Sequence, residues 1–314
     1  MEVVDLSDPP PAVPCAGPTG VVVATGDPSH PNAEYWFRQA SFTLVDSDVD
    51  DARVVRVESV ASALRTVADR VATWPHAASV CDDVLRALDP AAPVQAGVIT
   101  ESLAYSTLQS GPEFARWLAE RGPAQLPVTP DPVVTHRDGP RLHITFNRPA
   151  RHNAFTTESR AALLEALTVA RIDPGIVEVL LDGNGPSFCS GGDLAEFGTF
   201  ADPASAHLAR TRHSPALALA DITARLGAAC RAIVHGRVLG SGLEMAAFCG
   251  TVICHPDAVL GLPELTLGLI PGAGGTVSIT RRIGRWRTAY LVLSGQTIDS
   301  DTALGWGLVD AVGT

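Results

Sequence analysis

The stretch from Gly236 to Thr276, GRVLGSGLEMAAFCGTVICHPDAVLGLPELTLGLIPGAGGT, constrains this chain more than any other. It contains two glutamates, Glu244 and Glu264, each set among apolar residues and glycine. A carboxylate is costly to bury unless it is paired, so a carboxylate in an apolar setting needs a reason. Either glutamate alone could be a partly exposed or helix-capping residue. The two glutamates together, close to three glycines and the turn PGAGGT, indicate a catalytic site.

The composition excludes several classes of function. All 23 basic residues are arginine, which rules out Schiff-base or P-loop lysine chemistry. A net charge of −11 disfavours binding to nucleic acid or anionic membranes. No apolar run approaches the ~18 residues needed to span a membrane, and the acidic, proline-rich start MEVVDLSDPPP does not resemble a signal peptide. These features predict a soluble, cytoplasmic protein.

The six cysteines include no CxxC pair and no Cys/His spacing typical of a metal site. We therefore expect small apolar side chains in a reduced protein, and no metal. The cysteines are Cys15, Cys81, Cys189, Cys230, Cys249 and Cys254.

Changes in composition and apolar pattern along the chain predict four segments. Residues 1–19 are expected to form a flexible tail, and residues 20–122 a mainly helical region. Residues 123–132 are rich in proline and predict a linker. In residues 133–314 strand and helix patterns alternate, which predicts an α/β core.

The finer pattern predicts a buried strand over residues 21–25 and helices near 58–71, 77–88 and 98–121, the last broken near 110–112. Beyond the linker it predicts strands over 142–146 and 177–181, a helix that starts at Thr156 or Thr157, and another over about 216–230. The segment 199–215 has no clear pattern and is expected to be mobile.

Five motifs in residues 133–312 resemble the crotonase (enoyl-CoA hydratase/isomerase) superfamily. They are FNRPARHNAF (146–155), SFCSGGDL (187–194), HGRVLGSGLEMAAFCG (235–250), LGLPELTLGLIPGAGGT (260–276) and LSGQTIDSDTALGWGLVDAV (293–312). The resemblance implies a spiral of ββα units that binds an acyl-CoA thioester. It also implies two backbone N–H groups, of Gly192 and Ser241, that polarise the thioester carbonyl. Fixed donors of this kind stabilise the developing enolate oxygen.

The resemblance assigns the catalytic roles to the two glutamates. Glu244 would orient or activate water, and Glu264 would exchange a proton with the carbon next to the thioester, which gives syn hydration of a 2-enoyl-CoA. Burial suits both because it raises the pKa of a carboxyl toward neutrality. A double-bond isomerase, or another thioester-enolate enzyme of the same fold, is the nearest alternative. A catalytically inactive CoA-binding protein or structural subunit is another, supported by Ser241, which stands where the family usually has glycine, and by the rearranged ends. Gly250 stands where the family often has aspartate.

The resemblance also implies that main chain near two loops cradles the CoA, which would be the only cofactor and would belong to the substrate. The residues concerned are His152, Ala154, Ser190, Gly191, Asp193, Leu194, Gly240 and Pro263. The basic cluster of residues 281–287 could contact CoA phosphates or could be a solvated helix end. The family's habit implies a homo-oligomer, either a trimer or a hexamer.

Family members usually continue beyond GLVDAV with helices that cover the acyl pocket, whereas this sequence stops at Thr314. The segments 57–78 and 101–122 look like those helices. Residues 43–122 are therefore expected to be a permuted or duplicated copy of that tail, with an unrelated helical appendage as the alternative.

Overall fold

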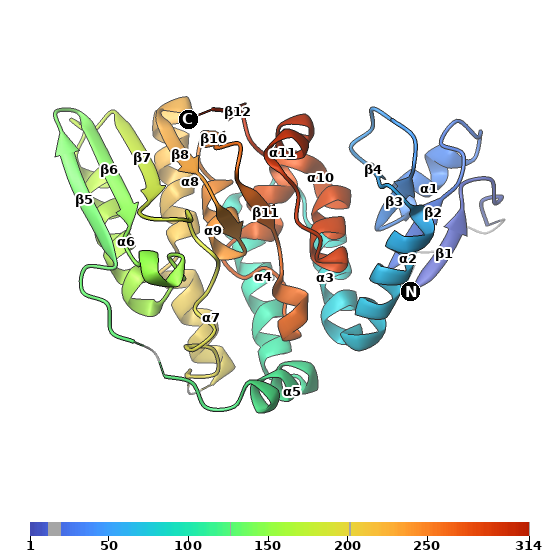
Figure 1. Ribbon diagram of the computed structural model, residues 1–314, viewed down its shortest axis with the longest axis horizontal. Coiled ribbons are helices and arrows are strands. Elements are labelled where there is room, and N and C mark those ends of the chain that lie inside the picture. The colour runs from blue at the N-terminus through green and yellow to red at the C-terminus, as the bar shows by residue number, and fades with distance from the viewer. Residues whose placement is uncertain (12–19, 126, 201, 314) are drawn as a thin grey trace.

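The computed structural model describes residues 1–11, 20–125, 127–200 and 202–313. Its main sheet has six strands in the order β12-β10-β8-β7-β6-β5 (Figure 1). All neighbours in it are parallel except the hairpin of β5 and β6. The strands are β5 (Val133–Asp138), β6 (Arg141–Phe146), β7 (Glu178–Gly183), β8 (Cys230–Val234), β10 (Thr251–Cys254) and β12 (Ala311–Val312).

A second, two-stranded parallel sheet gives the core its repeat. β9 (Arg237–Leu239) pairs with β11 (Val259–Gly261). The chain thus runs from β8 through β9 to helix α9 (Ser241–Ala246), and then from β10 through β11 to the 3-10 helix η3 (Glu264–Leu267). Each passage is one strand–strand–helix unit, so the predicted α/β spiral of ββα units is confirmed.

Helices α6 (Thr157–Ile172) and α8 (Pro215–Leu226) pack together beside the main sheet. Thr156 caps α6, as predicted, because its hydroxyl accepts the Ser159 amide at 3.1 Å. The prediction of a mobile segment over 199–215 was wrong: α7 (Pro203–Arg212) lies there, capped by Asp202 and packed against α4 (Val94–Gln109). The remaining core elements are η1 (Pro149–Arg151), η2 (Gly227–Ala229), α10 (Gly275–Ser294) and α11 (Ser300–Trp306).

The N-terminal region combines a four-stranded parallel sheet with five helices. Its strands are β1 (Glu2–Asp5), β2 (Val22–Thr25), β3 (Phe42–Val45) and β4 (Val54–Arg56). Its helices are α1 (Ala33–Gln39), α2 (Val60–Thr73), α3 (Pro75–Ala87), α4 (Val94–Gln109) and α5 (Pro112–Arg121). Helices α2 to α5 confirm the predicted helices and the break near 110–112, whereas α1 was not predicted.

The prediction of a flexible tail fails for its first residues. Val3 pairs with Val23, and Val4 and Leu6 are buried, so residues 2–5 form the edge strand β1. A run as short as EVVD gives too little periodicity to reveal a strand whose partner lies twenty residues away. Residues 12–19 of the expected tail lie outside the described residues.

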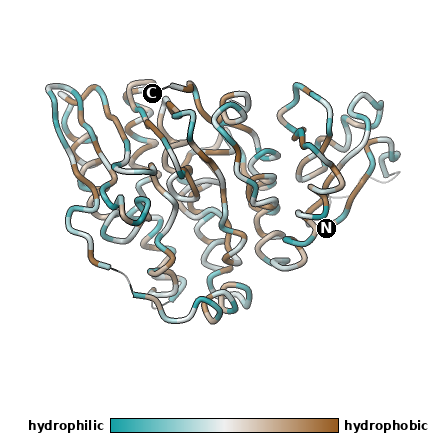
Figure 2. The backbone as a smooth tube through the Cα atoms, viewed as in Figure 1, coloured by the Kyte–Doolittle hydropathy of each residue, from teal (hydrophilic) through white to brown (hydrophobic). Residues whose placement is uncertain are grey.

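One hydrophobic core joins the N-terminal region to the rest of the molecule. Helix α10 packs against α2, α3 and α4, and Val67, Cys81 and Val277 from three of these helices are buried in the same cluster. Figure 2 shows apolar positions along the central strands and helices of both regions. A smaller cluster lies between α1 and the sheet β1–β4. Val98 of α4 belongs to the same cluster as Val277, so apolar packing fixes α4 relative to α10. Within the described ranges, no helix has both the length and the apolar character to cross a membrane.

Candidate active site

Three chain segments end side by side in the middle of the molecule. Leu239 is in register with Gly261, and the Gly240 amide donates to the Gly261 carbonyl at 3.0 Å. On the other side of β9, the Leu239 amide donates to the Cys189 carbonyl at 3.0 Å. Because these segments are parallel, the residues that follow them gather at one edge, where ligands of α/β folds usually bind. Gly192, Ser241 and Glu264 come together in this way.

Two amides at this edge have no partner in the part of the chain that the structure describes. Phe155 donates to the Gly191 carbonyl at 2.8 Å and accepts from the Asp193 amide at 2.9 Å, so the Gly192 amide between them points away from Phe155. Ser241 is the first residue of α9, where amides have no intrahelical acceptor. Both residues line one cavity of about 180 Å³.

Glu244 also lines this cavity, and its side chain is held by backbone. Its Oε2 accepts the amides of Ala273 and Gly275, both at 2.7 Å. Gly275 must be glycine for this contact, because a Cβ there would lie 2.5 Å from the Glu244 Cγ. Burial, together with the charges of Glu101 and Glu264, holds the pKa of Glu244 well above its ordinary value.

Glu264 is the fourth cavity residue that the sequence predicted as part of the site. It is buried, and its Oε2 has no hydrogen-bond partner among the described residues. Gly240 makes room for it: its φ of +49° suits glycine, and a Cβ there would lie 2.5 Å from the Glu264 Oε1. Burial and the nearby charge of Glu101 raise the pKa of Glu264 to about 8.

A third buried carboxylate, Glu101 of α4, was missed by sequence reasoning. It accepts the Gly274 amide at 2.7 Å, and the amide and hydroxyl of Thr276 at 2.8 and 2.7 Å. Burial raises its pKa to about 7. A signal was present in the sequence, because Glu101 falls on the helical stripe of Val98, Tyr105 and Leu108, which are all buried.

Glu101 and Glu244 divide four successive amides between them. Glu244 takes residues 273 and 275, and Glu101 takes 274 and 276. These amides belong to the PGAGGT turn at the start of α10, where backbone N–H groups lack acceptors and the helix dipole favours negative charge. Helix α4 therefore fixes the same turn that positions Glu244.

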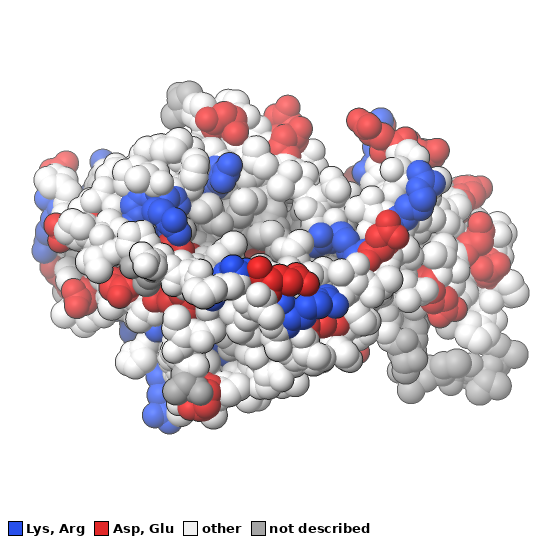
Figure 3. Space-filling view, turned by 60° about the horizontal axis from the view of Figure 1, so that its bottom comes forward, with Lys and Arg blue, Asp and Glu red and all other residues white. Residues whose placement is uncertain are grey.

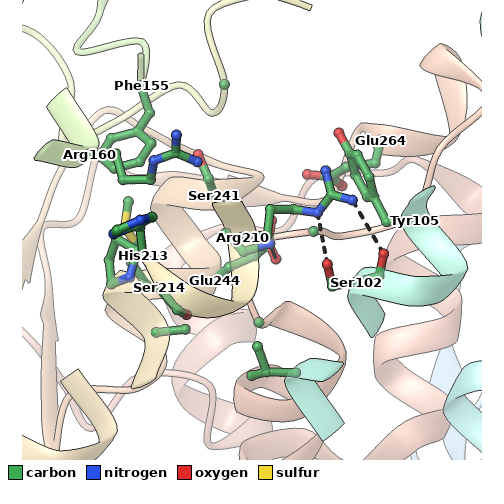
Figure 4. Close-up of a pocket in the computed structure, with 18 of the residues that line it drawn as sticks. Ser102, Tyr105, Phe155, Arg160, Arg210, His213, Ser214, Ser241, Glu244 and Glu264 are labelled. Atoms are coloured by element: carbon green, nitrogen blue, oxygen red, sulfur yellow. Dashed lines mark hydrogen bonds between the residues drawn. The ribbon is translucent and has the colours of Figure 1, made fainter. Parts of the chain in front are cut away.

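The rest of the cavity wall comes from both regions of the chain (Figure 4). Helix α4 contributes Ser102 and Tyr105, whereas Arg160 lies on α6 and Arg210 on α7. The guanidinium of Arg210 lies 4.5 Å from the centre of the Tyr105 ring. None of these four was predicted, because each depends on packing between segments far apart in sequence.

The residues predicted near CoA surround the cavity without lining it. The His152 ring lies 2.9 Å from the Ser187 hydroxyl. Asp193 is buried between Arg148 and Arg151 at 3.0 and 2.8 Å, and the Leu194 carbonyl accepts from Arg121 of α5. The remaining ones, Ala154, Ser190, Gly191, Gly240 and Pro263, lie in the loops that carry Phe155, Gly192, Ser241 and Glu264.

The predicted basic cluster on α10 is engaged in internal contacts. Arg281 donates to the Ala92 carbonyl, Arg282 to Cys249, and Arg285 to Ala40. Figure 3 shows several other basic side chains, all arginines, around a hollow in the molecular surface. No cluster of three or more His, Cys, Asp or Glu side chains suited to a metal occurs in residues 1–11, 20–125, 127–200 and 202–313.

The part of the chain that carries this site is similar to known proteins. The family described as enoyl-CoA hydratase/isomerase matches residues 141–314. The chain is 36% identical to the 2,3-dehydroadipyl-CoA hydratase of Escherichia coli K12, over 57% of this chain and 68% of that one. A crystal structure of an enoyl-CoA hydratase from Thermoplasma volcanium has a TM-score of 0.50 at 31% identity, over 58% and 71% of the two chains. An enoyl-CoA hydratase/carnithine racemase from Magnetospirillum magneticum has a TM-score of 0.52 at 26% identity, over 59% and 68%.

Replacing Glu101 by Gln should change the titration of its neighbours as well as stability. Loss of one acceptor oxygen leaves an amide of the turn poorly paired, so the free energy of unfolding should fall by about 1–3 kcal/mol. Loss of the Glu101 charge should lower the pKa of both Glu244 and Glu264, measured by NMR of labelled glutamate side chains. Glu113→Gln is the matched control, since Glu113 is buried and accepts the amides of His76 and Ala77 outside the cavity. An equal pKa of Glu264 in the two variants would contradict the conclusion that the charge of Glu101 raises it.

Replacing Glu264 by Gln should alter how stability depends on pH. The folded-state pKa of about 8 lies above the ordinary 4.5, so the folded protein keeps a proton that the unfolded chain releases between these values. Stability from this group is present at low pH and is lost as the pH rises toward 8. The free energy of unfolding of Glu264→Gln, relative to the unaltered protein, should therefore increase by roughly 1.4 kcal/mol per pH unit between about pH 5 and 8. Urea denaturation at four pH values tests this, and a constant difference would refute it.

Proposed function

Because the chain belongs to the enoyl-CoA hydratase/isomerase family, a family of enzymes, we propose that it is an enoyl-CoA hydratase. The reaction is syn addition of water across the double bond of a 2-enoyl-CoA thioester. The observation that carries the proposal is one cavity in which two buried glutamates face two amides without partners in the described residues.

In this proposal the amides of Gly192 and Ser241 bind the thioester oxygen. Hydration of the enoyl group turns that oxygen into an enolate, so its negative charge grows as the reaction proceeds. Two fixed N–H donors stabilise the charge without any reorganisation, and each such donor is typically worth about 2.7–4 kcal/mol of activation free energy.

The two glutamates handle the protons. Glu244 takes a proton from the water that forms the new C–O bond at C3, and Glu264 gives a proton to C2 of the resulting enolate. The pKa of about 8 suits Glu264 for this, since it is mainly protonated at neutral pH. The amides of Ala273 and Gly275 lower the pKa of Glu244 and so offset part of the rise that burial causes. Proton exchange with solvent then restores both groups.

The N-terminal region is proposed to supply the helical cover that the resemblance places at the end of other family members. Support comes from α4, which brings Ser102, Tyr105 and Gln109 to the cavity wall. It also comes from the matched relative, since the similarity covers 68% of that chain and leaves the remainder without a counterpart in the alignment. Residues 20–122 would then be part of the catalytic domain rather than an appendage.

Replacing Glu244 or Glu264 by Gln should each lower kcat for hydration of but-2-enoyl-CoA by roughly 100-fold or more, since each removes a group that transfers a proton. The loss of the conjugated thioester's ultraviolet absorbance measures the reaction. Glu165→Gln, at an exposed position on α6, is the control and should match the unaltered protein. Full hydration activity of Glu244→Gln would exclude the role proposed for Glu244, whereas formation of a 3-enoyl-CoA in place of the hydrated product would favour an isomerase. Binding of butanoyl-CoA without any turnover by the unaltered protein would favour a non-catalytic CoA-binding protein.

A further inference from the structure

The cavity wall contains two arginines that the proposed hydration does not use. Arg160 projects from α6 on the side of Phe155, and Arg210 from α7 on the side of Tyr105 (Figure 4). Neither forms an ion pair with a carboxylate within the ranges that the structure describes. Two guanidinium groups without a paired carboxylate are unusual in a half-buried site.

Arg210 is fixed in place by neutral groups. It donates to the Ser102 hydroxyl at 3.1 Å, to Gln109 Oε1 at 2.9 Å and to the Ser106 hydroxyl, and it stacks over Tyr105. These contacts orient the guanidinium and leave its positive charge uncompensated by any direct partner. Such an arrangement is preorganised for an anion, because the side chain does not need to be ordered when the ligand binds.

Arg160 makes no side-chain hydrogen bond to any residue whose position is described. The carboxylate that influences it most is that of Glu196, whose two oxygens already accept the Thr157 amide at 3.0 and 2.9 Å. A guanidinium carries five N–H donors. A half-buried guanidinium without acceptors loses part of its hydration and gains no hydrogen bonds in compensation. An acceptor supplied by a ligand would satisfy these donors.

The buried glutamates do not supply that acceptor. Glu244 and Glu101 accept backbone amides, and neither they nor Glu264 approach Arg160 or Arg210 within ion-pair distance. CoA phosphates are a second possible source of oxyanions, but they are separated from the thioester by the long pantetheine arm. The arginines line the same cavity of about 180 Å³ as Glu244 and Glu264. An anion that reaches them together with the reacting carbons therefore belongs to the acyl group.

We propose that the substrate's acyl group ends in a carboxylate, which Arg160 and Arg210 bind at the end remote from the thioester. The chemical class is a 2-enoyl-CoA derived from a dicarboxylic acid. The reaction part of this proposal rests on the proposed hydratase function, whereas the recognition of the carboxylate by the cavity does not.

Matched pairs of acyl-CoAs test the recognition. The substrates are 4-carboxybut-2-enoyl-CoA and pent-2-enoyl-CoA, which have the same chain length and differ in a terminal carboxylate or methyl group. We expect kcat/KM to favour the carboxylate by roughly ten- to a hundredfold, and Arg160→Gln to reduce that ratio by a similar factor, because charged hydrogen bonds to the carboxylate are lost. Arg171→Gln is the control, since Arg171 lies on the same helix, pairs with Asp221 and does not line the cavity. It should keep the ratio unchanged.

Calorimetry with the saturated analogues, 4-carboxybutanoyl-CoA and pentanoyl-CoA, separates recognition from catalysis. If neither enoyl-CoA is hydrated but the carboxylated analogue binds more tightly and Arg160→Gln removes that advantage, the hydratase function fails and the recognition stands. Equal affinity for both analogues would overturn the recognition. So would an Arg160→Gln protein that binds both analogues and free CoA more weakly by the same factor, since the arginine would then contact CoA phosphates.

Discussion

The interaction on which the site depends is the sharing of four consecutive amides by Glu101 and Glu244. The amides start helix α10, and the two carboxylates approach them from different parts of the chain. A helix start needs acceptors, and a buried carboxylate needs donors, so each group satisfies the other's requirement. The glycines of the turn make this possible because a Cβ at Gly275 would collide with Glu244. A shift of the turn would move Glu244 with it.

The parallel register of β9 and β11 is the second feature that determines the positions of the site residues. It places Ser241 and Glu264 within three residues of two paired strand ends, and the bridge between Cys189 and Val238 brings Gly192 to the same edge. The bridge to Phe155 turns the Gly192 amide away from that strand, whereas the Ser241 amide lacks an intrahelical acceptor because it starts α9. The raised pKa values of the two glutamates result mainly from burial at that edge, together with the charge of Glu101 and, for Glu244, that of Glu264.

Sequence reasoning reached the parts of the site that local patterns encode. Glu244, Glu264 and the glycine-rich turns lie in contiguous sequence motifs. The helices with regular apolar stripes were also predicted from local patterns. Glu101 was missed because its partners are 173 and 175 positions away and its own helix has little polar contrast between faces. Helix α7 was missed because it is mostly polar and gains its place by packing on α4. Strand β1 and the roles of Arg160 and Arg210 likewise depend on long-range contacts, so they could not be predicted from the local sequence.

The separation between Glu101 and the turn that it binds also bears on how the molecule is made. During synthesis α4 emerges long before residues 274–276, so its carboxylate must stay hydrated until the last third of the chain has followed. Closing so large a loop costs conformational entropy before any contact is gained, and native contacts of this separation form slowly. The cavity is accordingly among the last features that can assemble, and chaperones would meet an N-terminal half in which Glu101 still lacks the amides that it binds in the folded protein.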